Sequence, residues 1–310
     1  MRVCRDRPVV PLSRSSIVTI GNFDGVHVGH RALIDRCRSL QGEEDDLAVV
    51  TFEPLPRAFF KPEDAPPRLS SPAERIRLLE RAGADLVWML RFDRQTAEIE
   101  AEAFVKAVLV ESLGARHVVT GDDFRFGHRR EGDLELMRSM GERLGFHAHV
   151  VETVTMHGQR VSSGAVREAL AASDFERAAA LLGRPYSITG RVQRGRQLGR
   201  KLGYPTANIA IRALPSPVQG VFAVRARIAG DAWRPGVANL GRRPAVGGED
   251  LLLEVHFLDH EASLYGEKLQ TQFVAKLRDE AHFTTMEDMV CQRKKDEQQA
   301  RAILGAEKQT

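Results

Sequence analysis

The residues best suited to chemistry are two histidines, His27 and His30, in the segment Gly21–His30, GNFDGVHVGH. A short apolar run, Ile17–Ile20, precedes this segment, and a helical pattern, His30–Leu40, follows it. A loop between a strand and a helix N-terminus offers free backbone N–H groups and the positive end of the helix dipole, which favour phosphate. Imidazoles three positions apart fall on one side of a turn and can stabilise charge that develops on a phosphate. The segment therefore predicts a phosphate site.

Three glycines in this segment, Gly21, Gly25 and Gly29, allow tight turns and a close approach of the backbone to a ligand. The residues alone leave two alternatives open. In the first, one histidine packs in the core and the other is exposed without a functional role. In the second, the pair binds a metal, but no nearby HxH or HxxxH pattern supplies a third ligand.

A loop with two acids and two aromatic residues, GDDFRFGHRREGD, follows the strand-like run His117–Thr120. Asp122 and Asp123 are suited to accept hydrogen bonds from hydroxyls of a ligand, and Phe124 is suited to stack on a ring. The alternative is a turn with two solvated acids, because Asp and Gly are common turn residues.

The second half of the chain contains a basic segment, residues 191–201, with five Lys or Arg residues and no acid. Three glycines within and just after it predict a flexible loop that folds over phosphates, with Lys201 as one of its basic residues; these glycines are Gly195, Gly199 and Gly203. The alternatives are a solvated basic face or a nucleic-acid surface. The second is disfavoured because no aromatic residues are interleaved with the charges.

Two further groups could act on a phosphate donor. In the tetrapeptide PTAN, the Thr206 hydroxyl and the Asn208 carbonyl oxygen suit Mg²⁺, which keeps waters and bridges ATP phosphates. Glu254 interrupts the apolar run 251–257, where partial desolvation would raise the pKa of its carboxyl and improve it as a base. On pattern alone, a strand edge and an outward-facing glutamate are the alternatives.

Residues 15–183 alternate strand-like and helical segments, which predicts an α/β fold with a Rossmann-like parallel sheet and ligands at the carboxyl ends of its strands. The strand-like runs are Ile17–Ile20, Leu47–Phe52, Asp85–Leu90, His117–Thr120 and His147–Val151. The helical patterns are His30–Leu40, Pro72–Ala82, Ile99–Leu113 and Gly132–Leu144.

The rhythm changes near residue 184, where we place a boundary between domains 1–184 and 185–310. Strand-like runs with Gly and Pro turns follow, and five or six such short strands predict a small antiparallel β-barrel. Examples are Tyr186–Val192, Val221–Ile228, Leu251–Leu258 and Lys268–Val274. A charged helix, Thr284–Leu304, ends the chain, with Thr284 as its expected cap.

Composition limits the function classes. The 310 residues are 43% hydrophobic and 28% charged, and the 45 basic residues nearly balance the 42 acidic ones, for a net charge of +3. This balance argues against general nucleic-acid binding. No apolar run reaches the ~18 residues that span a bilayer, so we expect no membrane binding. We also expect a monomer or weak homo-oligomer. The three separated cysteines argue against a disulfide framework and favour a cytoplasmic location.

With these motifs in order, the chain resembles the prokaryotic bifunctional riboflavin kinase/FMN adenylyltransferase (FAD synthetase) family. GNFDGVHVGH resembles the HxGH signature of nucleotidylyltransferases, and TFEPLP, GDDFRFG and VSSGAVREAL follow as in that family. Residues 183–209, which contain PTAN, resemble the riboflavin kinase module.

The resemblance implies small-molecule substrates: riboflavin and ATP give FMN, and FMN and ATP give FAD. It assigns the adenylyltransferase ATP site to Gly21, Asn22, Phe23, Asp24, His27, Gly29, His30, Ser162, Ser163 and Arg167, with His27, His30 and Arg167 catalytic. It assigns its flavin site to Asp122, Asp123 and Phe124. In the kinase the resemblance implies that Glu254 is the base. It implies that Thr206 and Asn208 bind Mg²⁺ and ATP, and that Arg278 and Phe283 bind the flavin.

Three rival functions remain. One is a different HxGH adenylyl- or cytidylyltransferase, which would need no second module. Another is a silent flavin- or nucleotide-sensing regulator, and the third is an RNA-binding protein that uses the basic segment.

Overall fold

The computed structural model describes residues 1–5, 8–193, 204–211, 216–228, 230–245, 248–258 and 264–306. It divides into two units, residues 1–66 with 70–163 and residues 67–69 with 164–310. The expected domain boundary at residue 184 stays a prediction. Four residues predicted to bind ATP lie outside the described residues: Gly195, Gly199, Lys201 and Gly203.

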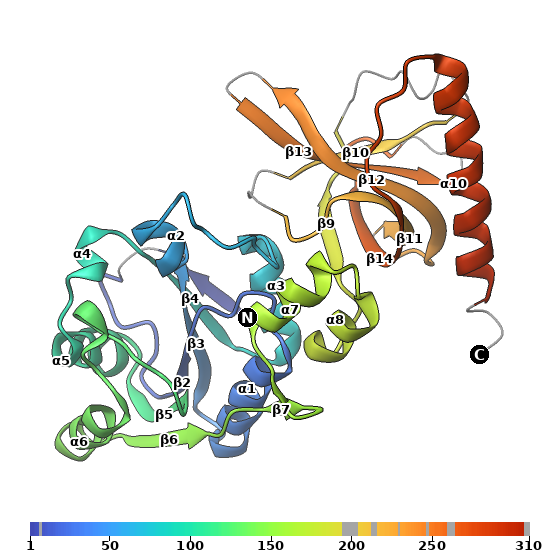
Figure 1. Cartoon of the computed structure of the whole chain (residues 1–310). Coiled ribbons are helices and arrows are strands. Elements are labelled where there is room, and N and C mark those ends of the chain that lie inside the picture. Colours follow the sequence, from blue (N-terminus) through green and yellow to red (C-terminus); the bar gives the residue numbers. More distant parts are fainter. Residues whose placement is uncertain are drawn as a thin grey trace. The chain divides into compact units, whose positions relative to one another are not determined.

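A parallel six-stranded sheet forms the centre of the first unit (Figure 1). In spatial order its strands are β1 (Arg2–Cys4), β4 (Leu86–Arg91), β3 (Asp46–Glu53), β2 (Ser16–Ile20), β5 (Ala115–Gly121) and β6 (His147–Val151). The chain passes from β2 through β3 to β4 and then returns to the other side of β2 for β5 and β6. The loop after β2 therefore lies where the strand order reverses, the usual ligand position in such sheets.

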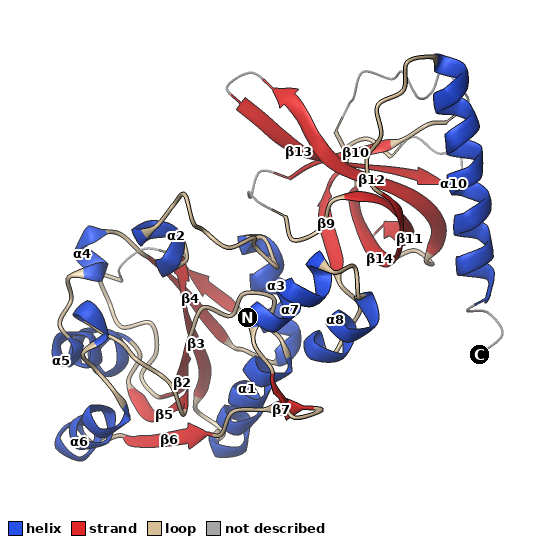
Figure 2. Ribbon diagram, in the orientation of Figure 1, coloured by secondary structure: helices blue, strands red, loops and turns tan. Residues whose placement is uncertain are grey.

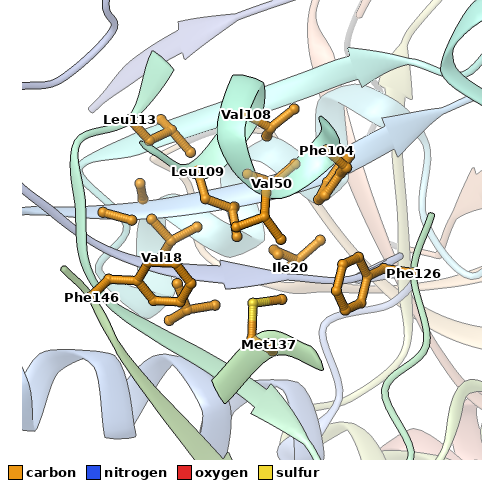
Figure 3. Close-up of a cluster of buried hydrophobic side chains, with 14 of the residues drawn as sticks. Val18, Ile20, Val50, Phe104, Val108, Leu109, Leu113, Phe126, Met137 and Phe146 are labelled. Atoms are coloured by element: carbon orange, nitrogen blue, oxygen red, sulfur yellow. The ribbon is translucent and has the colours of Figure 1, made fainter. Parts of the chain in front are cut away.

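Helices cover both faces of this sheet (Figure 2). The helix α1 (Val28–Leu40) and the helix α3 (Pro72–Ala82) pack on one face, and the short helix α5 (Ala101–Phe104), the π-helical turn η1 (Val105–Ser112) and the helix α6 (Leu134–Leu144) pack on the other. Figure 3 shows the second core, in which Phe104, Leu109 and Met137 surround Val18 and Ile20 of β2. Because successive strand residues face opposite sides, Ile17 belongs to the first core.

Shorter elements complete the first unit: α2 (Pro56–Phe60), α4 (Arg94–Ala97), the 3₁₀ turn η2 (His128–Arg130) and a hairpin of β7 (Thr155–Met156) and β8 (Gln159–Arg160). Ser71 caps α3, because its hydroxyl accepts a hydrogen bond from the Glu74 N–H at 3.1 Å.

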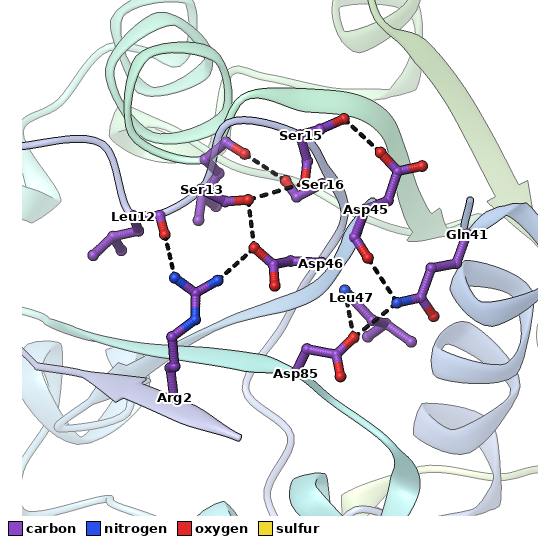
Figure 4. A network of polar contacts seen from close by, with 11 residues as sticks. Arg2, Leu12, Ser13, Ser15, Ser16, Gln41, Asp45, Asp46, Leu47 and Asp85 are labelled. Carbon is purple, nitrogen blue, oxygen red and sulfur yellow. Dashed lines mark hydrogen bonds and ion pairs between the residues drawn. The ribbon is translucent and has the colours of Figure 1, made fainter. Parts of the chain in front are cut away.

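A polar network joins the amino ends of the strands, at the edge of the sheet opposite the loop after β2 (Figure 4). The Asp46 carboxylate accepts hydrogen bonds from the Ser13 hydroxyl at 2.6 Å and from Arg2. The Asp85 carboxylate accepts one from the Leu47 N–H at 3.0 Å. These contacts fix the starts of the strands with side chains that take no part in either candidate site.

An antiparallel six-stranded sheet forms most of the second unit. In spatial order its strands are β10 (Ala207–Ile211), β13 (Gly248–Phe257), β12 (Arg234–Ala245), β11 (Gly220–Ile228), β14 (Lys268–Arg278) and β9 (Ser187–Arg191). A bridge between Gln193 and Asn208 brings the two edges together, so the sheet is a nearly closed barrel, as the sequence predicts. The helices α7 (Ser163–Ala171) and α8 (Phe175–Leu182) precede it.

The long helix α10 (Met286–Ala306) packs on the barrel through Ala300 and Leu304, which contact Ala223 and Val237. The predicted cap at Thr284 is wrong by one residue. The Thr285 hydroxyl accepts a hydrogen bond from the Asp288 N–H at 3.1 Å, which satisfies an N–H group of the first turn. In the part of the chain that the structure describes, no helix is long and apolar enough to cross a membrane.

Candidate active sites

The loop between β2 and α1 has an unusual backbone. Phe23, Gly25 and Val26 have φ values of 49°, 80° and 42°, a region that residues other than glycine seldom occupy. The Val26 N–H closes the turn with a hydrogen bond to the Phe23 carbonyl at 3.2 Å. Phe23 and Val26 are buried, so packing holds the strained conformation. Strain of this kind is typical of a loop whose shape serves a ligand.

Hydrogen bonds from β3 and α3 hold the start of this loop. The Asn22 carbonyl accepts from the Thr51 hydroxyl and from Arg75 Nη1, each at 3.0 Å. Arg75 is buried and forms an ion pair with Glu53 at 2.7 Å. The Asn22 side chain is left exposed at the carboxyl edge of the sheet.

Ser70 and Ser163 hold the middle of the loop. The Asp24 carboxylate is buried and accepts from the Ser70 N–H at 3.1 Å and from the Ser70 hydroxyl at 3.2 Å. The Ser163 hydroxyl donates to the Asp24 carbonyl at 2.9 Å. The second predicted phosphate segment therefore contacts the first at Ser163, and the Asp24 carboxylate supports the loop.

Ser162 and Arg167 flank this contact in the chain. Ser162 is half-buried, directly before α7. Arg167 lies in the second unit, where its Nε donates to the Pro67 carbonyl at 2.5 Å.

The two histidines stack against each other at the start of α1. Their ring centroids lie 3.6 Å apart, and the His30 ring also lies 4.9 Å from the Phe23 ring. His27 is the N-cap, and its Nδ1 accepts from the His30 N–H at 3.3 Å. Because Nδ1 accepts, the ring proton of neutral His27 lies on Nε2, which makes that atom a donor. A Cβ at Gly29 would lie 3.2 Å from the His27 ring, so Gly29 makes room for the imidazole.

Burial, and then the neighbouring His27, hold the pKa of His30 well below its usual value of 6.5. His30 is therefore neutral near pH 7, and its Nδ1 is buried without a hydrogen-bond partner among the described residues. A neutral imidazole presents one donor and one acceptor. The pair can donate hydrogen bonds to a phosphate next to the free N–H groups of the helix start.

The acidic loop after β5 is more tightly held than a solvated turn. The Asp122 carboxylate accepts from the Thr153 N–H at 3.1 Å and from the Thr153 hydroxyl at 2.7 Å, and these bonds lower the pKa of Asp122. Asp123 pairs with Arg160 at 2.5 Å. Phe124 stacks on Phe126, with ring centroids 5.5 Å apart. Asp122 and Asp123 stay exposed and Phe124 is half-buried.

Four phenylalanines form an aromatic cluster, and the sequence analysis did not include them. Phe52 at the end of β3, Phe59 and Phe60 of α2, and Phe92 after β4 have ring centroids between 5.3 and 5.7 Å apart. Phe60 is 64% exposed. The cluster lies at the carboxyl edge of the sheet, where an apolar ring could stack. The sequence does not reveal this cluster, because Phe92 follows β4, whereas the other three phenylalanines lie in β3 and α2.

The second unit holds a cavity of about 400 Å³, lined by residues of β11, β12, β13, β14 and α10 and of the segments that flank them. One row of paired residues crosses the barrel beside it. From β10 to β14 this row reads Asn208, Glu254, Asn239, Val221 and Arg278. The barrel register thus places the candidate base between a candidate metal ligand and a candidate flavin residue.

Strand alternation decides which way Glu254 faces. Leu253 and Val255 are buried in the barrel core, whereas Glu254 is half-buried and lines the cavity together with Thr206. Asn208, its cross-strand partner, is also buried, and its Nδ2 donates to the Thr206 carbonyl at 3.3 Å. This orientation fixes the amide nitrogen and leaves the amide oxygen as a potential ligand.

Arg278 of β14 also lines the cavity and is held there by α10. Its Nε and Nη2 bind the Asp296 carboxylate at 2.9 and 2.8 Å, and its guanidinium carbon lies 5.7 Å from the Phe283 ring. Asp296 is only 3% exposed. In the sequence it is one acid in a charged helix, RKKDEQQ, so no signal separates it from its exposed neighbours.

Comparisons with known proteins identify the family of both halves of the chain. A family model described as FAD synthetase matches residues 10–165, and one described as riboflavin kinase matches residues 182–304. The chain is 43% identical to the bifunctional riboflavin kinase/FMN adenylyltransferase of Escherichia coli (strain K12) over 94% of each chain. It is 44% identical to the protein of that name from Pseudomonas fluorescens, again over 94% of each chain.

A solved structure from Streptococcus pneumoniae, described as a macrolide-efflux protein, has a similar fold. The TM-score is 0.82 at 27% identity, and the match covers 97% of this chain and 99% of that one.

Proposed function

The chain belongs to the family of bifunctional riboflavin kinase/FMN adenylyltransferases, and we propose that its two units divide the two reactions. The second unit phosphorylates riboflavin with ATP to give FMN, and the first adenylylates FMN with ATP to give FAD and pyrophosphate. The observation that supports this division is that each unit has its own group of candidate site residues. The first unit has the stacked His27 and His30, and the second has the cavity lined by Glu254. FAD is then a product and not a prosthetic group.

In the adenylyl transfer, an oxygen of the FMN phosphate attacks the α-phosphorus of ATP, and the bond to the β-phosphate breaks. No group of the protein needs to form a covalent intermediate, so positioning and charge stabilisation supply the rate. His27 and His30 donate hydrogen bonds to the triphosphate at the α1 N-terminus. The loop residues Gly21, Asn22, Phe23, Asp24 and Gly29 shape the pocket for ATP.

Ser162 and Ser163 begin the second phosphate segment predicted from the sequence. Arg167 of that segment stays a sequence-based prediction for the pyrophosphate leaving group, because a guanidinium binds phosphate oxygens bidentately. Asp122, Asp123 and Phe124 bind the flavin substrate. We add the exposed cluster around Phe60 to this flavin site, because the isoalloxazine ring is aromatic and needs an apolar surface.

In the kinase reaction, Glu254 accepts the proton of the primary ribityl hydroxyl as that oxygen attacks the γ-phosphorus of ATP, and ADP leaves. Its half-buried position in the cavity wall supports this role. Arg278 and Phe283, which line the same cavity, hold the flavin. Gly195, Gly199, Lys201 and Gly203 remain predicted ATP contacts outside the described residues.

The kinase residues fit Mg²⁺. The Thr206 hydroxyl and the Asn208 amide oxygen are neutral, hard donors, and among the described residues no group of three His, Cys, Asp or Glu side chains could hold a metal. Mg²⁺ typically keeps several waters and binds through substrate phosphates, so two protein ligands are sufficient. When bound, the ion would neutralise charge on the ATP phosphates while Thr206 and Asn208 orient them.

Chromatography of flavins after incubation of the purified protein with riboflavin, ATP and Mg²⁺ tests the proposal. We expect FMN to appear first and FAD to follow, both dependent on Mg²⁺. If FAD forms from added FMN but riboflavin is not phosphorylated, the kinase assignment is wrong. If neither product forms, both assignments fail.

Several expectations about the whole protein stay predictions. They are a cytoplasmic location, a monomer or weak homo-oligomer, and no binding of nucleic acid or membrane. Light scattering at several protein concentrations would measure the oligomeric state directly.

A further inference from the structure

His256 lies two residues after Glu254 on β13 and lines the same cavity. Its Nδ1 is 2.9 Å from the carbonyl oxygen of Pro205. A carbonyl oxygen can only accept a hydrogen bond, so Nδ1 must carry the ring proton. Neutral histidine in solution has a second tautomer with the proton on Nε2, and this contact excludes it.

The contact occurs where the backbone pairing between β10 and β13 ends. The register runs from Ile211 opposite Leu251 to Ala207 opposite Val255. Pro205 lacks an N–H group, so it cannot donate to a continued ladder, and its carbonyl needs another partner. The His256 side chain supplies that partner and extends the attachment of the chain to β13.

Both carbonyls next to the Thr206 side chain are thereby held. The Pro205 carbonyl accepts from His256, and the Thr206 carbonyl accepts from Asn208 Nδ2 at 3.3 Å. With its backbone fixed on both sides, Thr206 lines the cavity next to Glu254. His256 thus links the strand that carries the base to the segment that carries the candidate metal and phosphate ligand.

Side-chain packing supports the same segment from α10. The Tyr204 ring lies 5.2 Å from the His256 ring, and the Arg293 guanidinium carbon lies 5.6 Å from the Tyr204 ring. All three side chains line the cavity. Ring and cation–π contacts of this kind restrict the rotation of the imidazole and keep Nδ1 directed at Pro205.

We propose that His256 is a positioning residue of riboflavin phosphorylation. It acts through Pro205 and fixes Thr206 relative to Glu254, without touching the reacting atoms. The inference rests on the proposed kinase site. Loss of the hydrogen bond would let Thr206 shift and would misplace the phosphate donor, so the KM for ATP should rise and kcat should fall. The KM for riboflavin should change less, because Arg278 and Phe283 bind the flavin elsewhere in the cavity.

A pair of amide variants in the full-length protein tests the hydrogen bond. The side-chain nitrogen of Asn lies near the position of histidine Nδ1, whereas that of Gln lies near Nε2. We expect His256→Gln to lower kcat/KM for ATP by ~10- to 100-fold, typical of a lost supporting contact, and His256→Asn to recover most of the loss. FMN adenylylation and the thermal unfolding midpoint of both variants serve as controls for folding.

A second readout does not depend on activity. In a long-range ¹H–¹⁵N spectrum of the protein labelled at its 10 histidines, the His256 signals are those lost in His256→Asn. We expect the pattern of an Nδ1–H ring. A parent that forms no FMN contradicts the proposed function. If the parent protein is active, three results would contradict this inference. They are equal impairment of the two variants, an unimpaired His256→Gln variant, and a spectrum in which the ring proton of His256 lies on Nε2.

Discussion

Glu254 and His30 belong to different units and are proposed for different reactions, so each can be removed alone. Gln in place of Glu254 keeps the size of the side chain but cannot accept a proton. We expect Glu254→Gln to slow the formation of FMN from riboflavin by ~10²- to 10⁴-fold, the usual contribution of a general base. Formation of FAD from supplied FMN should persist, and chromatography of the two flavins measures both rates.

His30→Ala provides the reciprocal test of this division. It should suppress FAD formation from FMN and leave riboflavin phosphorylation intact. A folded Glu254→Gln protein that loses both activities would contradict the assignment of the reactions to two sites. So would an equal loss of both activities in His30→Ala.

A second group of histidines should contribute, together with His30, to the response of stability to pH. His117 Nδ1 and His149 Nε2 lie 3.0 Å apart on β5 and β6, and His147, Arg36, Arg116 and Asp45 surround them. Burial, and then the neighbouring histidines and arginines, lower the pKa of both His117 and His149 below 6.5, against a smaller opposing effect of Asp45 on His117. The unfolded state therefore binds more protons than the folded state near pH 6.

The free energy of unfolding should consequently fall as the pH drops through the unfolded pKa of about 6.5, and it should recover as the pH rises. We expect His149→Gln to make this dependence shallower between about pH 5.5 and 7.5. Urea denaturation across that range measures it. His157→Asn, at an exposed turn position, is the matched control. An unchanged slope in His149→Gln would contradict the role of the pair.

At the scale of single elements, the apolar pattern predicted the parallel sheet well because its central strands are short segments rich in Val, Ile and Leu. It missed β12, whose sequence RPGVANLGRRPA contains two prolines and two glycines, residues that are depleted in strands. Pairing with β11 and β13 on both sides overrides that local preference. Gly236 allows β12 to lie close to β13 and does not form a turn, since a Cβ at this position would lie 2.7 Å from the His256 carbonyl oxygen.

The candidate site shows the same division between local and tertiary signals. Gly21–His30 and PTAN are contiguous, so their residue types and spacing were enough to make them candidates. Asp296, Asn239 and the Phe60 cluster act through partners distant in the chain, and only the packing of α10, β12 and α2 brings them to a site. No local pattern in the sequence encodes those distances.

The helix α10 should control flavin binding through Asp296. In Asp296→Asn the side chain keeps its size, but its pairing with the Arg278 guanidinium loses the charge and one acceptor. We expect the KM of the kinase reaction for riboflavin to rise ~10-fold, because supporting contacts of this kind typically contribute 10- to 100-fold, while the KM for ATP changes little. Initial rates at varied riboflavin and ATP measure both constants.

Glu287→Gln, an exposed acid on the same helix, is the control for this variant. It should resemble the parent in both constants. If Asp296→Asn raises the KM values for riboflavin and ATP equally, α10 supports the whole cavity and not the candidate flavin residues Arg278 and Phe283 in particular.

At the scale of the whole molecule, the second unit begins before the change in sequence rhythm. The helix α8 precedes residue 184, yet its Phe175 packs into the barrel core, with its ring centroid 5.8 Å from Phe222 and 6.0 Å from Phe273. Phe175 is 7% exposed. The change from alternating to barrel-like patterns at residue 184 marks where strands begin, whereas the core of that unit also needs a helix from the preceding segment.

Two fragments should therefore differ in stability. We expect a fragment of residues 164–310 to be more stable than one of residues 185–310 by about 3 kcal/mol or more, since loss of a buried phenylalanine from a core typically costs that much. Thermal and urea unfolding of both fragments measure the difference. Phe175→Ala in the longer fragment should reproduce most of it, because it removes the same ring and keeps α8. Equal stability of the two fragments would place the boundary of the folding unit at residue 184. If the short fragment is less stable but Phe175→Ala does not destabilise the longer one, the effect belongs to the rest of α7 and α8.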